Sequence, residues 1–127
     1  MHTMEYVVIA LQLIVGLSLI NVWLVQPKKE TPYRGGDATT IFEEFQVYGL
    51  PLWSVYLIGA IKVLLGILLI AGIWFPMLKF PAATGLAILL AGSVSMHFRI
   101  GDPLIKSFPA ALFLLMCATI AYFSYPM

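Results

Sequence analysis

Four long runs of apolar residues dominate this sequence and limit the possible folds more than any other feature. The runs cover residues 6–25, 52–75, 81–98 and 104–125. A helix of about 20 apolar residues crosses the hydrocarbon core of a bilayer. Hydrophobic residues make up 61% of the chain and charged residues 10%, whereas about a quarter of the residues in a soluble domain are charged. We therefore predict an all-α integral membrane protein, with residues 1–127 forming a single domain.

The first run could also be a secretory signal peptide. However, residues 1–5 contain no Lys or Arg, and no small-residue cleavage site precedes Gln26. We interpret this run as a retained transmembrane helix.

The connections between the runs are short and rich in helix-breaking residues. Pro27 follows the first run, Gly49 and Pro51 precede the second, and Pro76 ends the second. Asp102 and Pro103 have the pattern of an N-cap followed by a first-turn proline, which predicts the start of the fourth helix there. Short connections favour an antiparallel four-helix bundle. Glycines at heptad spacing are the expected points of close helix approach: Gly59, Gly66, Gly85 and Gly92.

A short amphipathic segment, residues 38–48, separates the first two spans. Its apolar side carries Ile41, Phe42 and Phe45, and its polar side carries Glu43 and Glu44. We expect a short helix capped by Asp37 or Thr39, which lies at the membrane interface or folds back onto the bundle.

The distribution of positive charge predicts the orientation of the bundle. The first and third connections hold five Lys and Arg residues, against one in the second connection and both termini together. Because positively charged loops stay in the cytoplasm, both termini are expected on the periplasmic side of a bacterial inner membrane. Aromatic belts are expected from Trp23, Tyr48, Trp53 and Phe98 at the inner interface, and from Tyr6, Trp74, Tyr122 and Tyr125 at the outer one.

Lys62 is the single charge inside the second apolar run. A charge at this depth is costly, so it needs a partner or a function. One interpretation pairs Lys62 with Glu43 or Glu44, if the amphipathic segment folds inward. The other makes Lys62 a cation that binds an anionic or quinone-like headgroup, or that carries a proton.

The remaining polar residues gather at the predicted cytoplasmic end. His97 is expected to bond to a nearby carboxylate such as Asp102, and a metal site formed with Glu43 and Glu44 is the weaker alternative. Gly35 and Gly36 fit either an ordinary turn or an anion-binding nest. The candidate ligand-binding residues are Asn21, Arg34, Asp37, Glu43, Glu44, Lys62, His97, Arg99 and Asp102.

Several function classes lack support in the sequence. Cys117 is the only cysteine, so no intrachain disulfide can form, and we interpret it as a buried apolar residue. The net charge of +1 and the lack of a basic run argue against nucleic-acid binding. No catalytic motif for hydrolysis, nucleotide binding or zinc is present. These observations favour a protein with no catalytic activity of its own.

The sequence resembles the DoxX-like family of small four-helix membrane proteins, along nearly its whole length. The segments that carry the resemblance are NVWLVQP (21–27), TPYRGGDA (31–38), EEFQVYGLPLW (43–53), GAIKVLLGILLIAGIWFP (59–76) and MHFRIGDPLIKSFPA (96–110). Many DoxX-like proteins carry a glutamate in the second helix where this chain has Lys62. The resemblance implies roles such as a membrane subunit of a thiosulfate:quinone oxidoreductase, an associate of redox-defence enzymes, or a helper of ion-channel assembly.

Together these observations predict an accessory or ligand-binding membrane subunit. Its ligand would be a lipid-like small molecule between the helices, with quinone as one candidate, and no other cofactor is expected. Two alternatives stay open: a membrane subunit of a quinone-linked oxidoreductase, and an assembly or scaffold protein for another membrane protein. The bilayer is the expected partner, with a membrane protein or a second copy of the chain as further candidates.

Overall fold

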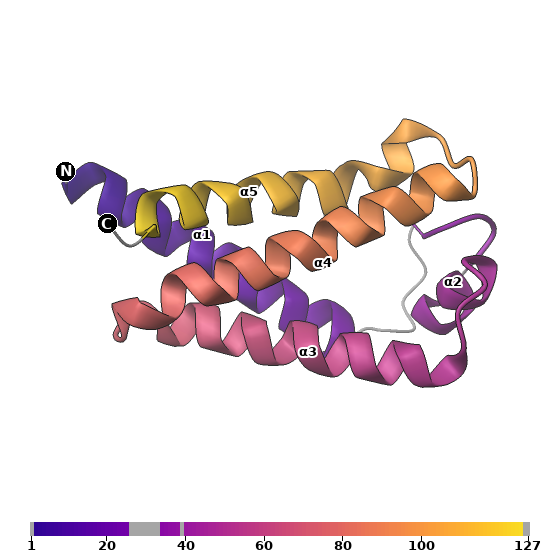
Figure 1. Cartoon of the computed structure of the whole chain (residues 1–127), viewed down its shortest axis with the longest axis horizontal. Helices are drawn as coiled ribbons and strands as arrows, with labels where there is room; N and C mark the ends of the chain where they lie inside the picture. The colour runs from indigo at the N-terminus through magenta and orange to yellow at the C-terminus, as the bar shows by residue number, and fades with distance from the viewer. Residues whose placement is uncertain (1, 26–33, 39, 126–127) are drawn as a thin grey trace.

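A computed structural model describes residues 2–25, 34–38 and 40–125, and every regular element in this part of the chain is helical (Figure 1). The long helices are α1 (His2–Ile20), α3 (Leu52–Ala71), α4 (Lys79–Arg99) and α5 (Phe108–Ser124). The short helix α2 (Ile41–Val47) lies between α1 and α3. A π-helix, η1 (Asn21–Val25), extends α1, and two 3₁₀ turns, η2 (Pro76–Leu78) and η3 (Leu104–Ser107), precede α4 and α5.

The four long helices lie along one another and form a bundle (Figure 1). α4 packs most extensively against α5, and α1 against α3. Four segments are long and apolar enough to cross a membrane: Thr3–Leu24, Leu52–Ala71, Pro76–Arg99 and Leu104–Ser124. The start of α1 and the end of α5 lie at the same end of the bundle, and α2 lies at the opposite end. The predicted all-α, four-span fold with a short helix between the first two spans is confirmed.

The predicted ends of the second and third spans need correction. α3 ends at Ala71 rather than Phe75, because the amides of Ile73 and Trp74 bond to the carbonyls of Ile70 and Ala71 in tight turns. η2 then leads into α4, which begins at Lys79, so Pro81 lies inside the first turn instead of opening the helix. Proline is tolerated there because first-turn amides have no helical acceptor.

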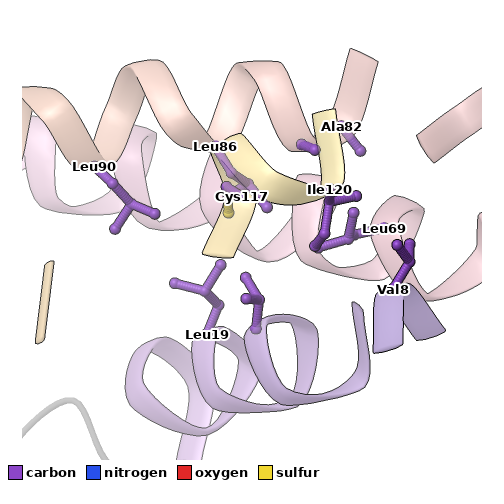
Figure 2. Packing of buried hydrophobic residues seen from close by; sticks show 10 residues of the cluster. Val8, Leu19, Leu69, Ala82, Leu86, Leu90, Cys117 and Ile120 are labelled. Carbon is purple, nitrogen blue, oxygen red and sulfur yellow. The ribbon is translucent and has the colours of Figure 1, made fainter. Parts of the chain in front are cut away.

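The main hydrophobic core receives residues from all four long helices (Figure 2). Val15, Leu69, Leu86, Cys117 and Ile120 have almost no exposed surface. The burial of Cys117 confirms the interpretation of this residue as part of the core. Gln12 is also fully buried, and its Nε2 donates to the carbonyl oxygen of Leu69 at 2.8 Å. This bond joins α1 to one of the last carbonyls of α3, which have no partner within their own helix.

Two of the four glycines expected at close approaches do lie in tight contacts. A Cβ at Gly59 would lie 2.6 Å from the Trp23 ring, and one at Gly85 would lie 3.0 Å from Leu65. A Cβ at Gly66 would lie 3.5 Å from the Gly16 carbonyl oxygen, which is an ordinary van der Waals contact. Gly92 lacks any such contact, because a Cβ there would meet nothing within 4 Å. The expected packing role is therefore wrong for Gly92, which lines a cavity instead.

α2 folds back onto the bundle rather than lying apart at the interface. Ile41 and Phe45 are buried and pack in one cluster with Val55 of α3. The cap of α2 is Thr40, whose Oγ1 accepts from the Glu43 amide at 3.1 Å. The expectation that Asp37 caps this helix is therefore wrong. The other expected cap, Thr39, lies outside the described residues. Thr40 has the extended backbone of an N-cap and lies three residues before Glu43, as in a capping box.

Candidate functional site

A cavity of about 490 Å³ lies between the bundle and α2. Each long helix contributes apolar side chains to its wall, including Leu19, Ile58, Leu90 and Phe113. Polar side chains also reach this cavity: Arg34, Glu44, Tyr48, Lys62, Ser93, His97 and Lys106. Ligand pockets have volumes of about 300–1,000 Å³ and combine mostly apolar walls with a few polar groups. The volume and the lining of this cavity fall within the range of known small-molecule pockets.

Lys62 is buried in the wall of this cavity, with 6% of its surface exposed. Its Nζ lies 3.3 Å from the Ser93 Oγ and 5.1 Å from the centre of the Trp23 ring. Ser93 Oγ lies within 3.4 Å of the Leu89 carbonyl oxygen, so the hydroxyl can donate there and accept from Lys62. An ammonium group has three donors, and Ser93 accepts one of them. The cation is held by a hydroxyl and an aromatic face rather than by a carboxylate.

Glu44 faces the same cavity but has other partners. One carboxylate oxygen accepts from the Tyr48 hydroxyl at 2.6 Å, and the other lies 3.5 Å from the Arg34 guanidinium. Glu44 and Tyr48 are four residues apart on α2, so both side chains lie on one face of the helix. The expected pairing of Lys62 with Glu43 or Glu44 is therefore corrected: no salt bridge joins Lys62 to either residue in the described part of the chain.

The loop after α4 places Asp102 against His97. Gly101 has a φ of +74°, and the amides of Gly101 and Asp102 bond back to the carbonyls of Phe98 and His97. This is the Schellman motif, which ends a helix with glycine in the left-handed conformation. The motif turns the Asp102 carboxylate back onto the helix, where Oδ2 lies 2.8 Å from His97 Nδ1.

The expected contact between His97 and Asp102 is thus confirmed, but Asp102 does not cap the fourth helix. α5 begins at Phe108, after the η3 turn.

Gly36, in the loop before α2, binds this carboxylate. The Gly36 amide donates to Asp102 Oδ1 at 3.1 Å, and the Gly36 carbonyl accepts from Lys106 Nζ. Gly36 has a φ of +54°, a conformation that favours glycine. Of the two alternatives for Gly35 and Gly36, the structure shows an ordinary turn, in which the Ala38 amide bonds to the Gly35 carbonyl at 3.1 Å, and the Gly36 amide of this turn binds a side chain of the same protein.

Tyr48 completes the polar cluster. Its hydroxyl lies 3.3 Å from His97 Nε2 as well as 2.6 Å from Glu44. We use the name polar relay for Glu44, Tyr48, His97 and Asp102, which follow one another through these contacts. α2 ends in a second Schellman motif at Gly49 (φ +80°), where the Leu50 amide bonds to the Phe45 carbonyl. This turn leaves Tyr48 at the end of the helix, pointing into the bundle.

The hydroxyl of Tyr48 is expected to stay protonated until the protein unfolds. Burial raises the pKa of Tyr48 above its ordinary value of 10.0, and the negative charge of Glu44 raises it further. The folded state therefore retains a proton that the unfolded state loses, so this contribution to stability is complete below about pH 10 and is lost as the pH rises further.

An alkaline titration followed by tyrosinate absorbance should show one of the six tyrosines ionising only on unfolding. Tyr48→Phe should remove this late component and Tyr56→Phe should keep it. A late component that survives Tyr48→Phe would contradict the assignment.

The candidate residues fall into two groups. Arg34, Glu44, Lys62 and His97 line the cavity, and Asp102 lies behind His97. The other four are exposed and lie outside the cavity wall: Asn21, Asp37, Glu43 and Arg99. Sequence spacing placed all nine at one end of the bundle or near it, but it could not show which side chains turn inward.

Sequence reasoning missed the roles of three further residues. Tyr48 and Trp23 were expected in an aromatic belt, but Tyr48 is buried and Trp23 is half-buried beside Lys62. The four-residue spacing from Glu44 to Tyr48 was the one signal that could have revealed Tyr48. Lys106 was counted only as a loop charge. Trp53, Phe98, Tyr6, Trp74, Tyr122 and Tyr125 are exposed, as aromatic belts require.

In the comparison with protein families, residues 36–120 match the family described as the DoxX-like family. This range is more than half of the chain. The protein belongs to the DoxX-like family. The matched range includes the whole polar relay and Lys62, whereas α1 and Arg34 lie before it. No curated protein and no solved structure gave a significant match to this DoxX-like chain.

Proposed function

We propose that this DoxX-like protein is an accessory membrane subunit that holds one lipid-like molecule in the cavity, with the polar headgroup at Lys62. The observation that carries this proposal is the buried Lys62 ammonium in an otherwise largely apolar wall. Ser93 accepts one of its three donors, and a ligand with oxygen acceptors would satisfy the other two. The apolar wall would hold the tail of the same molecule.

The charges around the cavity favour a headgroup that accepts hydrogen bonds or carries negative charge. Arg34, Lys62 and Lys106 line the cavity as cations, against the single carboxylate of Glu44. Glu44 is already engaged by Arg34 and Tyr48. Quinone carbonyls and the phosphate of an anionic lipid share this chemistry. Both also occur in the bacterial inner membrane, where the positive-inside rule would place this end of the bundle at the cytoplasmic face.

Gly92 offers a direct way to test whether the cavity binds a ligand. It lines the cavity, and a Cβ added there meets nothing within 4 Å. Gly92→Phe should therefore fill the cavity without disturbing the helix contacts. Ala91→Phe is the matched control, because Ala91 is exposed on the same helix and does not line the cavity.

The measurement is native mass spectrometry, with an absorption spectrum, on protein purified gently from its own membrane. Wild type and Ala91→Phe should retain one ligand per chain, and Gly92→Phe should lose at least tenfold of it. A quinone absorption band would identify a quinone, and a phospholipid mass without that band would identify an anionic lipid. Equal retention in all three proteins, or bulk phospholipid alone, would overturn the proposal and favour a scaffold role.

A further inference from the structure

The hydroxyl of Tyr48 lies between two groups that can each hold a proton. Its distance of 2.6 Å from Glu44 Oε1 is typical of an O–H group that donates to a carboxylate. Its distance of 3.3 Å from His97 Nε2 permits a second, longer hydrogen bond. A tyrosine hydroxyl has one proton, so it can donate to only one of these neighbours and must accept from the other.

The other side of His97 fixes where its first proton lies. Nδ1 is 2.8 Å from Asp102 Oδ2, so Nδ1 carries a hydrogen and donates it to the carboxylate. Suppose that Nε2 has no proton and that the Tyr48 hydroxyl donates to Glu44. The lone pairs of Nε2 and of the Tyr48 oxygen would then face each other with no hydrogen between them. The contacts are satisfied together only when one additional proton is present, either on Nε2 or on Glu44.

We propose that the polar relay is a proton-transfer site, in which one proton moves between His97 Nε2 and the Glu44 carboxylate through the Tyr48 hydroxyl. In the forward step the Nε2–H bond breaks and a new O–H bond forms at Tyr48. At the same time the original Tyr48 O–H bond breaks and its proton joins Glu44 Oε1. Tyr48 ends with one proton, as it began, and the total charge of the relay does not change.

Charged groups from each neighbouring element lie close to the relay. Asp102, in the loop after α4, lies 2.8 Å from His97 Nδ1, and Arg34, before α2, lies 3.5 Å from Glu44. Lys106 of η3 reaches the Gly36 carbonyl behind Asp102, and Lys62 of α3 lines the same cavity. His97 and Glu44 are thus each held in place by a partner that does not take the proton.

The relay can be tested by nuclear magnetic resonance, whatever the cavity contains. The chain has two histidines, so the full-length His2→Ala variant in nanodiscs gives a single histidine signal, from His97. The ring is labelled with ¹⁵N and the glutamate carboxyls with ¹³C, and Glu44→Gln identifies the Glu44 signal. As temperature changes, His97 Nε2 and the Glu44 carboxyl should shift together, one losing proton character as the other gains it.

Replacing Tyr48 with phenylalanine should end this correlation and leave each signal at its own limiting shift. Tyr56→Phe is the matched control, because Tyr56 is exposed and lies away from the relay. If Tyr48→Phe does not fold, Glu44→Gln keeps the tyrosine but cannot take the proton, and His97 Nε2 should then lose its temperature dependence. Uncorrelated signals in the His2→Ala protein, or a correlation that survives either substitution, would overturn the relay. Loss of the cavity ligand would leave this result unchanged, so the two proposals can fail separately.

Discussion

Replacing Lys62 with methionine is expected to make the ligand-free bundle more stable and at the same time to abolish retention of the proposed ligand. Lys62 is buried, and its described contacts are the Ser93 hydroxyl and the Trp23 ring. A buried charge without a carboxylate partner costs free energy, and an apolar side chain of similar length removes that cost. The expected gain in the free energy of unfolding is about 1–3 kcal/mol.

This expectation is opposite in sign to the one that a Lys62–glutamate pair would give. If Lys62 neutralised a buried glutamate, its removal would leave that carboxylate unpaired and would destabilise the fold by about 3 kcal/mol or more. The structure instead engages Glu44 with Arg34 and Tyr48, so Glu44 keeps its partners in Lys62→Met. The sign of the change in the free energy of unfolding therefore distinguishes a lysine that binds a ligand from a lysine that stabilises the fold.

The measurement is unfolding of the ligand-free proteins in mixed micelles of a mild and a denaturing detergent, combined with native mass spectrometry of the proteins as purified. Lys79→Met is the matched control, because Lys79 is a half-buried lysine outside the cavity wall. Its change in stability should stay within about 0.5 kcal/mol, and its ligand should stay bound. A Lys62→Met protein that is less stable than wild type, or that still holds the ligand, would count against a ligand-binding role for this lysine.

Replacing Asp102 with alanine is expected to cause the largest loss of stability. The side chain of Asp102 is 6% exposed, and it accepts from both His97 Nδ1 and the Gly36 amide. Its removal leaves the buried His97 Nδ1 and the partly buried Gly36 amide without this acceptor. Breaking such a buried pair costs about 3–5 kcal/mol. The loss should also release the loop at residues 34–38 from the end of α4.

Asp37→Ala serves as the control for Asp102→Ala, because Asp37 is an exposed aspartate in that loop. Unfolding in the same mixed micelles should show a change within about 0.5 kcal/mol for Asp37→Ala. If the two variants were equally stable, the contacts of Asp102 would not hold the loop and α4 together.

The fold followed from the sequence because the four apolar runs mark the spans. Gly59 and Gly85, two of the glycines expected at close approaches, lie in tight contacts between helices. The predicted ends of the spans were less accurate, because Gly72 and the residues after it form tight turns that the pattern of hydrophobic residues does not reveal.

The site was predictable only in part, because its contacts join residues distant in the sequence. The pairing of His97 with Asp102 is local, five residues apart, and it was foreseen. The contact of Tyr48 with His97 spans 49 positions, and that of Gly36 with Asp102 spans 66. These contacts depend on how α2 folds back, and amphipathicity alone left that orientation open.

The π-helix η1, which extends α1, affects how the cavity could change during evolution. A π-turn usually arises from one extra residue in an α-helix, and each residue of an α-helix turns the chain by about 100°. Loss of Asn21, which precedes Trp23 in this turn, would rotate Trp23 away from Gly59 and from the Lys62 ammonium. The place of Trp23 in the cavity wall thus depends on the rotation of the helix about its axis as much as on residue identity. A family member could acquire a different binding preference by gaining or losing one residue there, with every cavity-lining side chain unchanged.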